Sequence, residues 1–399
     1  MKISFEKTSH FIKSAKDFVL MASGALIIGA LCGVIGALFV KSIEFVTELR
    51  AENGWLVYLL PVGGIAVAAI YKLTRNEGVG TIKVLESARG EAGISVLLLP
   101  VIFISTVITH LFGGSAGKEG AALQIGGAVS EAVSKVTRAN DEKRSVYTIC
   151  GMAALFSAAF GTPFGAWLFA LEVVFVKKTI LKAAVSSLLS SVIANVISVL
   201  LGVEPEKFEI KTMPDFGFVV FGKSLLVSAV VAVVSMIFCY FLHGGEKLFE
   251  KILKNPFIRI AAGGCAVIVL TLVFGTDYNG GGIGIIERIF EEGVVKPEAF
   301  LLKIIFTVIT VSSGFRGGEI VPSLYIGSTL GATLAQFSGL PLGFSAALGM
   351  TAFFSGVTNC PIAAAVIAIE LFGAEGFALF AVSSLVARAV SGKISLYNK

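Results

Sequence analysis

The sequence has few residues of the kinds that bind metals or form disulfide bonds. Its five cysteines, Cys32, Cys150, Cys239, Cys265 and Cys360, are scattered through apolar segments without a CxxC pair, and its three histidines form no cluster. Isolated cysteines in apolar segments are typical of small buried residues. The sequence therefore argues against a disulfide framework, and we expect no metal and no other cofactor.

Charged residues are also scarce, since they make up 15% of a chain of which 55% is hydrophobic. Long uncharged runs cover residues 18–40, 145–171, 183–203, 224–242, 260–276 and 320–369. About 20 apolar residues are enough to span a bilayer as a helix, so this pattern predicts an all-α polytopic membrane protein. The net charge of +5 forms no basic stripe along the chain, which gives nucleic-acid binding no support.

Residues 1–17 are predicted to form a cytoplasmic, amphipathic N-terminal segment. Four lysines precede the first apolar run, whereas the segment after that run mixes lysine and arginine with three glutamates. The positive-inside rule therefore places the N-terminus in the cytoplasm. The 23-residue run from Phe18 to Val40 is too long for a cleaved signal peptide. Residues 138–144 are predicted to form a charged surface loop.

A glycine-broken stretch, residues 113–127, places Lys118 and Glu119 inside an otherwise apolar region. Ionisable residues at membrane depth are costly and usually mark ion or proton pathways. An uncharged, helix-like run, residues 121–130, follows directly. The stretch thus combines a carboxylate with a helix N-terminus, where free backbone N–H groups favour an anion or an anionic side chain.

The two halves of the chain repeat one another. Three blocks match in the same order, at offsets of 198, 204 and 201 residues: 152–172 with 350–370, 78–82 with 282–286, and 121–126 with 322–327. Matches of this kind indicate duplication. The counterpart of the central stretch carries Arg316 and Glu319. Because transporters built from repeats bind substrate where the broken helices of both repeats meet, we expect a shared site there.

Together these motifs resemble the CLC family of chloride channels and anion/proton antiporters. Its G-K/R-E-G-P motif is similar to residues 117–121, its G-G-x-F-x-P motif to residues 317–322, and its G-S-G-I-P motif to residues 78–82. The likeness covers residues 18–397. It implies two inverted-topology repeats with many short, tilted and re-entrant helices, and a homodimer with one pathway per subunit. The anion-binding residues it implies are Val79, Gly80, Gly117, Lys118, Gly120, Gly318, Ile320, Val321 and Tyr397.

Besides the missing motif prolines at the positions of Ala121 and Ile82, the chain departs from the chloride-transporting pattern at three positions. Val79 stands where the family has a chloride-coordinating serine, Glu319 where it has an apolar residue, and Val173 where antiporters have an intracellular proton-relay glutamate. This combination resembles the fluoride-transporting branch of the family. It implies a fluoride/proton antiporter that exports fluoride from the cytoplasm, with Glu119 as gating carboxylate and proton acceptor and Glu319 as central proton relay.

Simpler roles for these residues remain open. Glu319 could pair with Arg316, and Glu119 could cap its helix or pair with Lys118. Lys118 itself could be structural, Val79 could be a packing residue, and Tyr397 could belong to an untethered tail. Two further carboxylates, Glu172 and Glu370, each close an apolar helix at equivalent places in the repeats. That equivalence favours a shared structural role over a proton pathway.

The alternative function is a chloride/proton antiporter or a passive chloride channel of the same family, and Val173 fits a passive channel equally well. We expect no enzyme, since the sequence shows no nucleophile with an adjacent base, no metal cluster and no phosphate loop. The predicted division is a first membrane repeat at 18–203, a connector at 204–215 and a second repeat at 216–399, without a C-terminal soluble regulatory domain. Together with the short length, this suggests a bacterial protein of the inner (plasma) membrane.

Overall fold

The computed structural model describes residues 2–175 and 180–397, and of residues 2–18 it describes the backbone alone. The first half of the chain forms α1 (Lys2–Glu52), the 3-10 helix η1 (Gly54–Leu59), α2 (Leu60–Leu73), α3 (Thr81–Ala88), α4 (Leu98–Leu111), α5 (Glu119–Val136), α6 (Asp141–Phe160), α7 (Pro163–Val174) and α8 (Ile180–Leu200). The second half forms α9 (Phe218–Ile252), α10 (Pro256–Phe274), α11 (Ile283–Glu291), α12 (Ala299–Ser313), α13 (Ile320–Ser338), α14 (Leu342–Thr358), α15 (Pro361–Phe372) and α16 (Phe377–Ser391). Because the described residues contain no strand apart from one isolated bridge, the all-α prediction is confirmed.

The apolar helices of this fold are of two lengths. Among the described residues, five helical segments are long and apolar enough to cross a membrane: Val19–Glu52, Gly54–Leu73, Ile180–Leu200, Phe218–Ile252 and Pro256–Phe274. Several other apolar helices, such as α7 and α15, have only 10–17 residues. A helix that short does not cross the hydrocarbon core alone, and broken helices of this kind can line a site inside a transporter.

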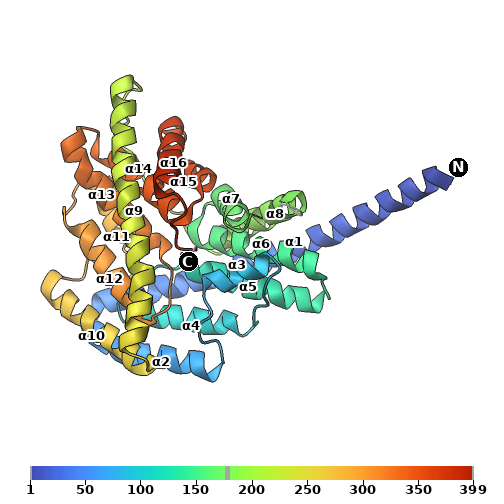
Figure 1. The fold of residues 1–399 in the computed structure, drawn as a ribbon, viewed down its shortest axis with the longest axis horizontal. Coiled ribbons are helices and arrows are strands. Elements are labelled where there is room, and N and C mark those ends of the chain that lie inside the picture. The colour runs from blue at the N-terminus through green and yellow to red at the C-terminus, as the bar shows by residue number, and fades with distance from the viewer. Residues whose placement is uncertain (1, 176–179, 398–399) are drawn as a thin grey trace.

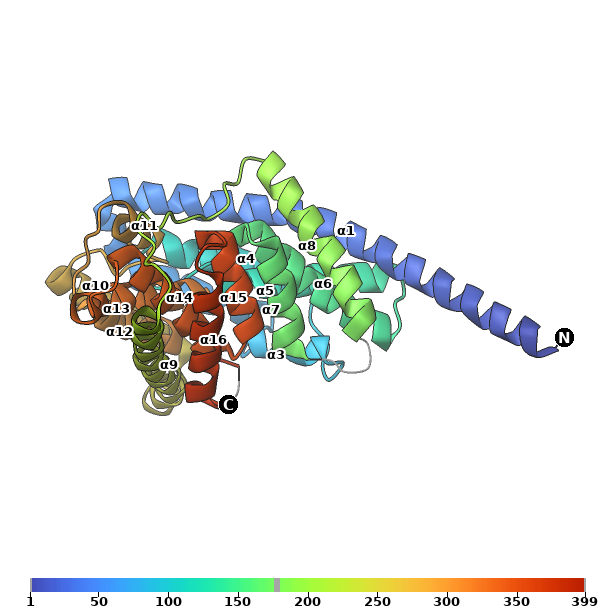
Figure 2. The same cartoon turned by 90° about the horizontal axis from the view of Figure 1, so that it is seen from above.

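The first helix extends well beyond the predicted span. α1 runs unbroken from Lys2 to Glu52, and its N-terminal part projects away from the other helices (Figure 1). Seen from above, the remainder of α1 lies along the bundle and passes α8, with which it packs (Figure 2). The predicted boundary at residue 17 thus falls inside a continuous helix, and the division of the chain into domains stays a prediction.

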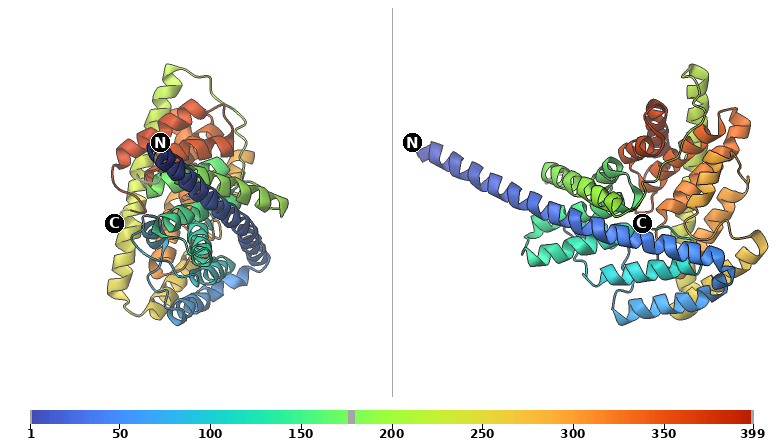
Figure 3. Two further views of the ribbon diagram at one scale, coloured as in Figure 1. Left: turned by 90° about the vertical axis from the view of Figure 1, so that its right-hand side faces the viewer. Right: turned by 180° about the vertical axis from the view of Figure 1, so that it is seen from behind.

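The first and second halves of the chain lie side by side (Figure 3, right). In each half two helices meet at glycines. A Cβ atom at Gly126 of α5 would stand 2.0 Å from the carbonyl oxygen of Gly151 in α6, and one at Gly327 of α13 would stand 2.5 Å from that of Gly349 in α14. Only glycine permits such close approach of two helix backbones. Gly126 and Gly327 are also counterparts in the sequence repeat, so both halves share one packing scheme.

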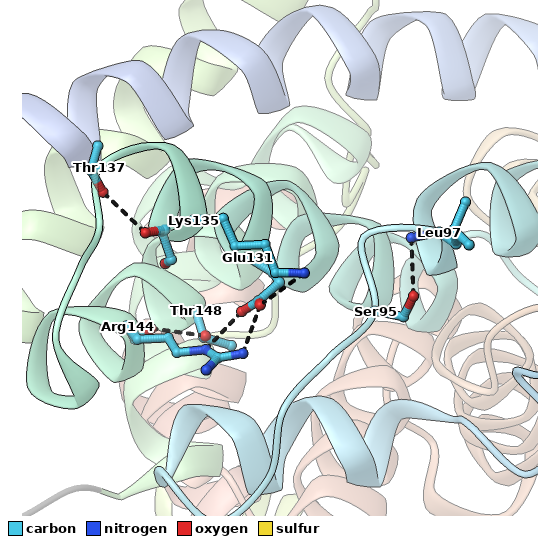
Figure 4. A network of polar contacts seen from close by, with 8 residues as sticks. Ser95, Leu97, Glu131, Lys135, Thr137, Arg144 and Thr148 are labelled. Atoms are coloured by element: carbon cyan, nitrogen blue, oxygen red, sulfur yellow. Dashed lines mark hydrogen bonds and ion pairs between the residues drawn. The ribbon is translucent and has the colours of Figure 1, made fainter.

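A buried ion pair fastens the far end of α5 to α6. Glu131 is 2% exposed, and the Arg144 guanidinium donates to both its oxygens, with Nε–Oε2 2.7 Å and Nη2–Oε1 2.6 Å (Figure 4). Lys135 approaches the same carboxylate at 3.6 Å. The prediction of a surface loop at 138–144 is therefore wrong in part, since α6 begins at Asp141 and Arg144 reaches inward from its first turn. Sequence reasoning missed the pair because Glu131 and Arg144 lie on different helices.

We expect Glu131→Gln to lower the free energy of unfolding by about 2 kcal/mol, because it leaves the Arg144 guanidinium without its carboxylate in a partly buried position. Thermal unfolding of the purified protein in detergent would measure the loss. Glu142→Gln is the matched control, since it removes an ion pair to Lys182 whose side chains are both 45% exposed and should cost less than about 0.5 kcal/mol. Equal effects of the two variants would contradict this assignment.

Candidate functional site

The helix N-termini of α5 and α13 are joined by two backbone hydrogen bonds. The Gly117 N–H donates to the Gly318 carbonyl at 2.7 Å, and the Gly318 N–H donates to the Gly117 carbonyl at 2.6 Å. A Cβ at Gly318 would stand 2.3 Å from the backbone nitrogen of Gly120, so a side chain there would separate the two helices. The structure thus brings together the two motifs that the sequence places about 200 residues apart.

This junction leaves unpaired backbone N–H groups on both helices. The first backbone donors bonded within the two helices are Ala122, which donates to Lys118, and Ser323, which donates to Glu319. The N–H groups before them, including those of Gly120, Ile320 and Val321, have no acceptor within their own helix. Two positive helix ends with free donors, facing each other, favour an anion.

Glu119 is fully buried at the start of α5. Neither carboxylate oxygen has a hydrogen-bond partner, and among the described residues Glu119 forms no ion pair. The carboxylate turns back toward the backbone of Lys118 and its own residue, and Oε2 would stand 2.8 Å from a Cβ at Gly117. An anionic side chain therefore covers the helix N-terminus, as the sequence predicted it could, and the proposed pair with Lys118 is not formed.

A cavity of about 780 Å³ opens onto Glu119 from one side of the protein. It is lined by the end of α1 with Glu44 and Glu48, by the connector around Glu206, and by the loop before α11. Gly117, Lys118 and Val321 form part of its floor. We refer to this cavity as the vestibule. It provides a route from solvent to the buried carboxylate.

Lys118 points into the vestibule and pairs with Glu206, at an Nζ–Oε1 distance of 3.3 Å. Both side chains are mostly buried. Sequence reasoning missed Glu206 because it lies in the connector between the repeats and belongs to no motif. The sequence feature that could have pointed to Glu206 was a carboxylate in that short polar segment.

Glu319 lies immediately before α13, next to the glycine junction. Its Oε2 would be 3.5 Å from a Cβ at Gly120, which places the second carboxylate beside the start of α5. Arg316 does not pair with it. The guanidinium carbon instead lies 4.1 Å from the centre of the Tyr71 ring, and Nη1 is 3.4 Å from the Val79 carbonyl oxygen. The alternative in which Glu319 is held by Arg316 is therefore wrong for this structure.

Four further predicted site residues fall into two sets. Ile320 and Val321 are buried in the first turn of α13. Val79 and Gly80 precede α3, and no atom beyond the adjacent residues lies within 4 Å of the place where a Cβ at Gly80 would stand, so this backbone faces open space. Arg316 links the two sets through its contact with the Val79 carbonyl. Val79 offers no hydroxyl donor to that space.

The last described residues, up to Tyr397, are fixed in place. The Leu396 N–H donates to the Val357 carbonyl at 2.8 Å, and the Tyr397 ring centre lies 6.5 Å from that of Phe169. The Tyr397 hydroxyl is buried without a hydrogen-bond partner, within electrostatic range of Glu319. The alternative of an untethered tail is therefore wrong, and the hydroxyl is an available donor close to the second carboxylate.

Glu172 and Glu370 cap each other's helices across the repeat boundary. Glu172, near the end of α7, accepts from the N–H groups of Ile362 (3.2 Å) and Ala363 (2.9 Å) at the start of α15. Glu370, near the end of α15, accepts from Phe164 (3.0 Å) and Gly165 (2.7 Å) at the start of α7. Each helix therefore begins beside the other's end, which is the inverted arrangement. The structural role favoured for both glutamates agrees with this geometry.

A buried lysine also escaped the sequence analysis. Lys303 in α12 is fully buried, and its ammonium donates to the carbonyls of Tyr278 (3.1 Å) and Gly280 (2.6 Å). It lies 5.0 Å from the Tyr325 ring centre. The lysine thereby holds the loop before α11, which lines the vestibule. The sequence feature that could have revealed Lys303 is its position as a single cation inside an apolar helix, since such residues usually have a functional or structural role.

The arrangement as a whole defines a class of membrane protein: a transporter or channel in which two inverted repeats aim broken helices at one internal point. A profile of the family described as "Voltage gated chloride channel" matches residues 63–392. The chain therefore belongs to this family, the CLC family, as the motifs indicated.

Similar proteins include transporters and channels. The "Chloride/fluoride channel protein" of Pseudomonas syringae pv. tomato is 33% identical over 387 residues, which cover 93% of this chain and 84% of that protein. The "H(+)/Cl(-) exchange transporter ClcA" of Vibrio cholerae serotype O1 is 26% identical, with 93% and 86% covered. The crystal structure of a CLC-type fluoride/proton antiporter superimposes with a TM-score of 0.91 at 31% identity, covering 95% of this chain and 97% of that one.

We expect Glu172→Gln and Glu370→Gln to lower the free energy of unfolding by similar amounts, about 1 kcal/mol each, because an amide retains one acceptor but loses the charge-assisted pair of bonds. Thermal unfolding in detergent would measure both. Glu375→Gln, at an exposed position in the loop after α15, should change nothing. A variant that stays fully stable would show that its glutamate does not hold the opposite helix.

Proposed function

We propose that this chain is a fluoride/proton antiporter that exports fluoride from the cytoplasm in exchange for protons. The observation that carries the proposal is the pair of carboxylates, Glu119 and Glu319, at the glycine junction of α5 and α13. Among the described residues neither is neutralised by an ion pair. The likeness to a chloride/fluoride channel protein and to a fluoride/proton antiporter over nearly the whole chain supports it.

The anion is bound by hydrogen-bond donors at the junction. The backbone N–H groups of Gly120, Ile320 and Val321 point from two helix N-termini, while Gly117 and Gly318 bring those helices together. Fluoride is small and a strong acceptor, so it suits a site of N–H and O–H donors. The partnerless Tyr397 hydroxyl would supply one more donor, and the Lys118 ammonium adds positive charge on the vestibule side.

Val79 lacks the hydroxyl of the family's chloride-coordinating serine, and this weakens chloride binding. A side-chain hydroxyl there would donate to an anion in the open space beside Gly80, and the valine isopropyl group cannot. A protonated Glu319 would act as a donor to the anion instead. Anion binding would then require a bound proton, which couples the two substrates.

Glu119 is the gate in this scheme. In its ionised form the carboxylate occupies the α5 N-terminus and competes with the anion for the same donors. Protonation removes that competition, because a neutral carboxyl group gains little from the positive helix end. Protons reach Glu119 through the vestibule, and Glu319 passes them on beyond the junction. Glu319 thus takes the proton-relay role of the glutamate that antiporters of this family have at the position of Val173.

The vestibule faces the outside of the cell in this proposal. The lysine-rich N-terminus lies on the cytoplasmic side by the positive-inside rule, so the other end of α1, with Glu44 and Glu48, reaches the external side. The protein resides in the bacterial inner (plasma) membrane and functions as a homodimer with one pathway in each subunit.

Flux from liposomes tests the function directly. We expect purified protein to release trapped fluoride rapidly, to take up protons in the opposite direction, and to release chloride slowly. A fluoride electrode, a chloride electrode and a pH electrode would follow the three ions, with protein-free liposomes as the control for leakage of hydrogen fluoride. Chloride release as fast as fluoride release would instead favour the chloride/proton antiporter or the passive chloride channel.

We expect Glu119→Gln and Glu319→Gln each to abolish proton-coupled fluoride exchange, because an amide neither carries the proton nor competes as an anion. The same liposome assay with an imposed pH gradient would measure the loss, reported as at least a 10-fold drop in coupled rate. Glu209→Gln, an exposed carboxylate in the connector, is the matched control. Normal pH-driven exchange in either site variant would remove that residue from the mechanism.

A further inference from the structure

Lys118 and Glu119 are neighbours in the sequence, yet the structure keeps their charges apart. The Lys118 ammonium binds Glu206 at 3.3 Å, while both Glu119 oxygens lack a hydrogen-bond partner. Both Lys118 and Glu206 lie within electrostatic range of Glu119. A single unbalanced positive charge beside Glu119 would stabilise its ionised form. The residue that pairs with Lys118 therefore affects how readily Glu119 is protonated.

Glu206 is held in place by the connector. The Phe208 N–H donates to the Leu371 carbonyl at 2.9 Å, and the Phe208 ring stacks on Phe290 with a centroid distance of 5.2 Å. On the other side, a Cβ at Gly161 would stand 2.5 Å from the Cα of Pro205, so the chain there lies directly against the end of α6. These contacts on either side of Glu206 fix the connector at the vestibule wall, from which the carboxylate reaches Lys118.

We infer that Glu206 is a positioning residue for the exchange reaction: it holds the Lys118 ammonium and balances its charge, so that Glu119 can be protonated from the vestibule. The inference rests on the proposed function, in which Glu119 is the proton acceptor. The connector between the repeats thereby acts on the gate through Lys118 and does not touch the anion itself.

Other charged groups also face Lys118 and Glu119 and set a common background. Those lining the vestibule are Glu44, Glu48 and Arg50 of α1, His110 of α4, Glu204 and Lys207 of the connector, and Asp277, Glu287 and Arg288 around α11. Glu319 lies on the opposite side of the junction. None of them forms an ion pair with Lys118 among the described residues, whereas Glu206 does. The test must therefore separate the contact with Lys118 from the general field of the vestibule.

A double-mutant cycle makes that separation. Fluoride/proton exchange would be measured in liposomes against the pH on the vestibule side for wild type, Glu206→Gln, Lys118→Met and the double variant. We expect Glu206→Gln to move the half-maximal pH about one unit lower, because the freed ammonium stabilises ionised Glu119. In the Lys118→Met background the same substitution should move it by less than half as much. Glu209→Gln, outside the vestibule, should leave the profile unchanged.

Two results would overturn the inference: an unchanged profile in Glu206→Gln, or a shift of equal size with and without Lys118. If Lys118→Met turns over too slowly, proton uptake on adding fluoride to the detergent-solubilised variants, followed with a pH indicator, provides the same comparison without transport. Failure of the proposed function is distinct, since wild-type protein would then exchange no fluoride for protons in the first place.

Discussion

Two backbone hydrogen bonds between Gly117 and Gly318 support the whole site. They join the starts of α5 and α13, which belong to different repeats, at distances that only glycine allows on either side. With the helices so joined, their free N–H groups point at one place, and the Glu119 and Glu319 carboxylates lie beside it. If the Gly117 and Gly318 backbones were separated, the N–H donors and both carboxylates would no longer lie at one place.

Most charged groups inside the described part of the helical bundle have partners, which makes the state of Glu119 informative. Glu131 binds Arg144, Glu172 and Glu370 each accept from two backbone N–H groups, and Lys303 donates to two carbonyls. Such pairing offsets the cost of removing charge from water. Glu119 is as deeply buried and has neither a hydrogen bond nor an ion pair. An unpaired carboxylate at the end of an open vestibule is suited to gaining and losing a proton.

Much of the fold was predictable from hydropathy and from the repeat. The long uncharged runs predicted the all-α class, and the matching blocks 152–172 and 350–370 each contain a break between two helices, before Pro163 and before Pro361. Prediction failed where helices continue or meet without a local signal. α1 continues through an expected boundary because its lysine-rich start has the same helical tendency as the span that follows. The role of Arg144 depended on a glutamate in another helix.

The sequence by itself determined the membrane-embedded class, the duplication, and the two charged glycine motifs, because hydropathy, repetition and glycine spacing are properties of neighbouring residues. Only the tertiary structure decided which charges are neutralised. Lys118 has Glu119 beside it in the chain and Glu206 beside it in space, and Arg316 stacks on Tyr71 although Glu319 is three residues away. The physical reason is that ion pairs form across contacts between helices and connectors, whose geometry depends on the packing of both repeats rather than on any local pattern.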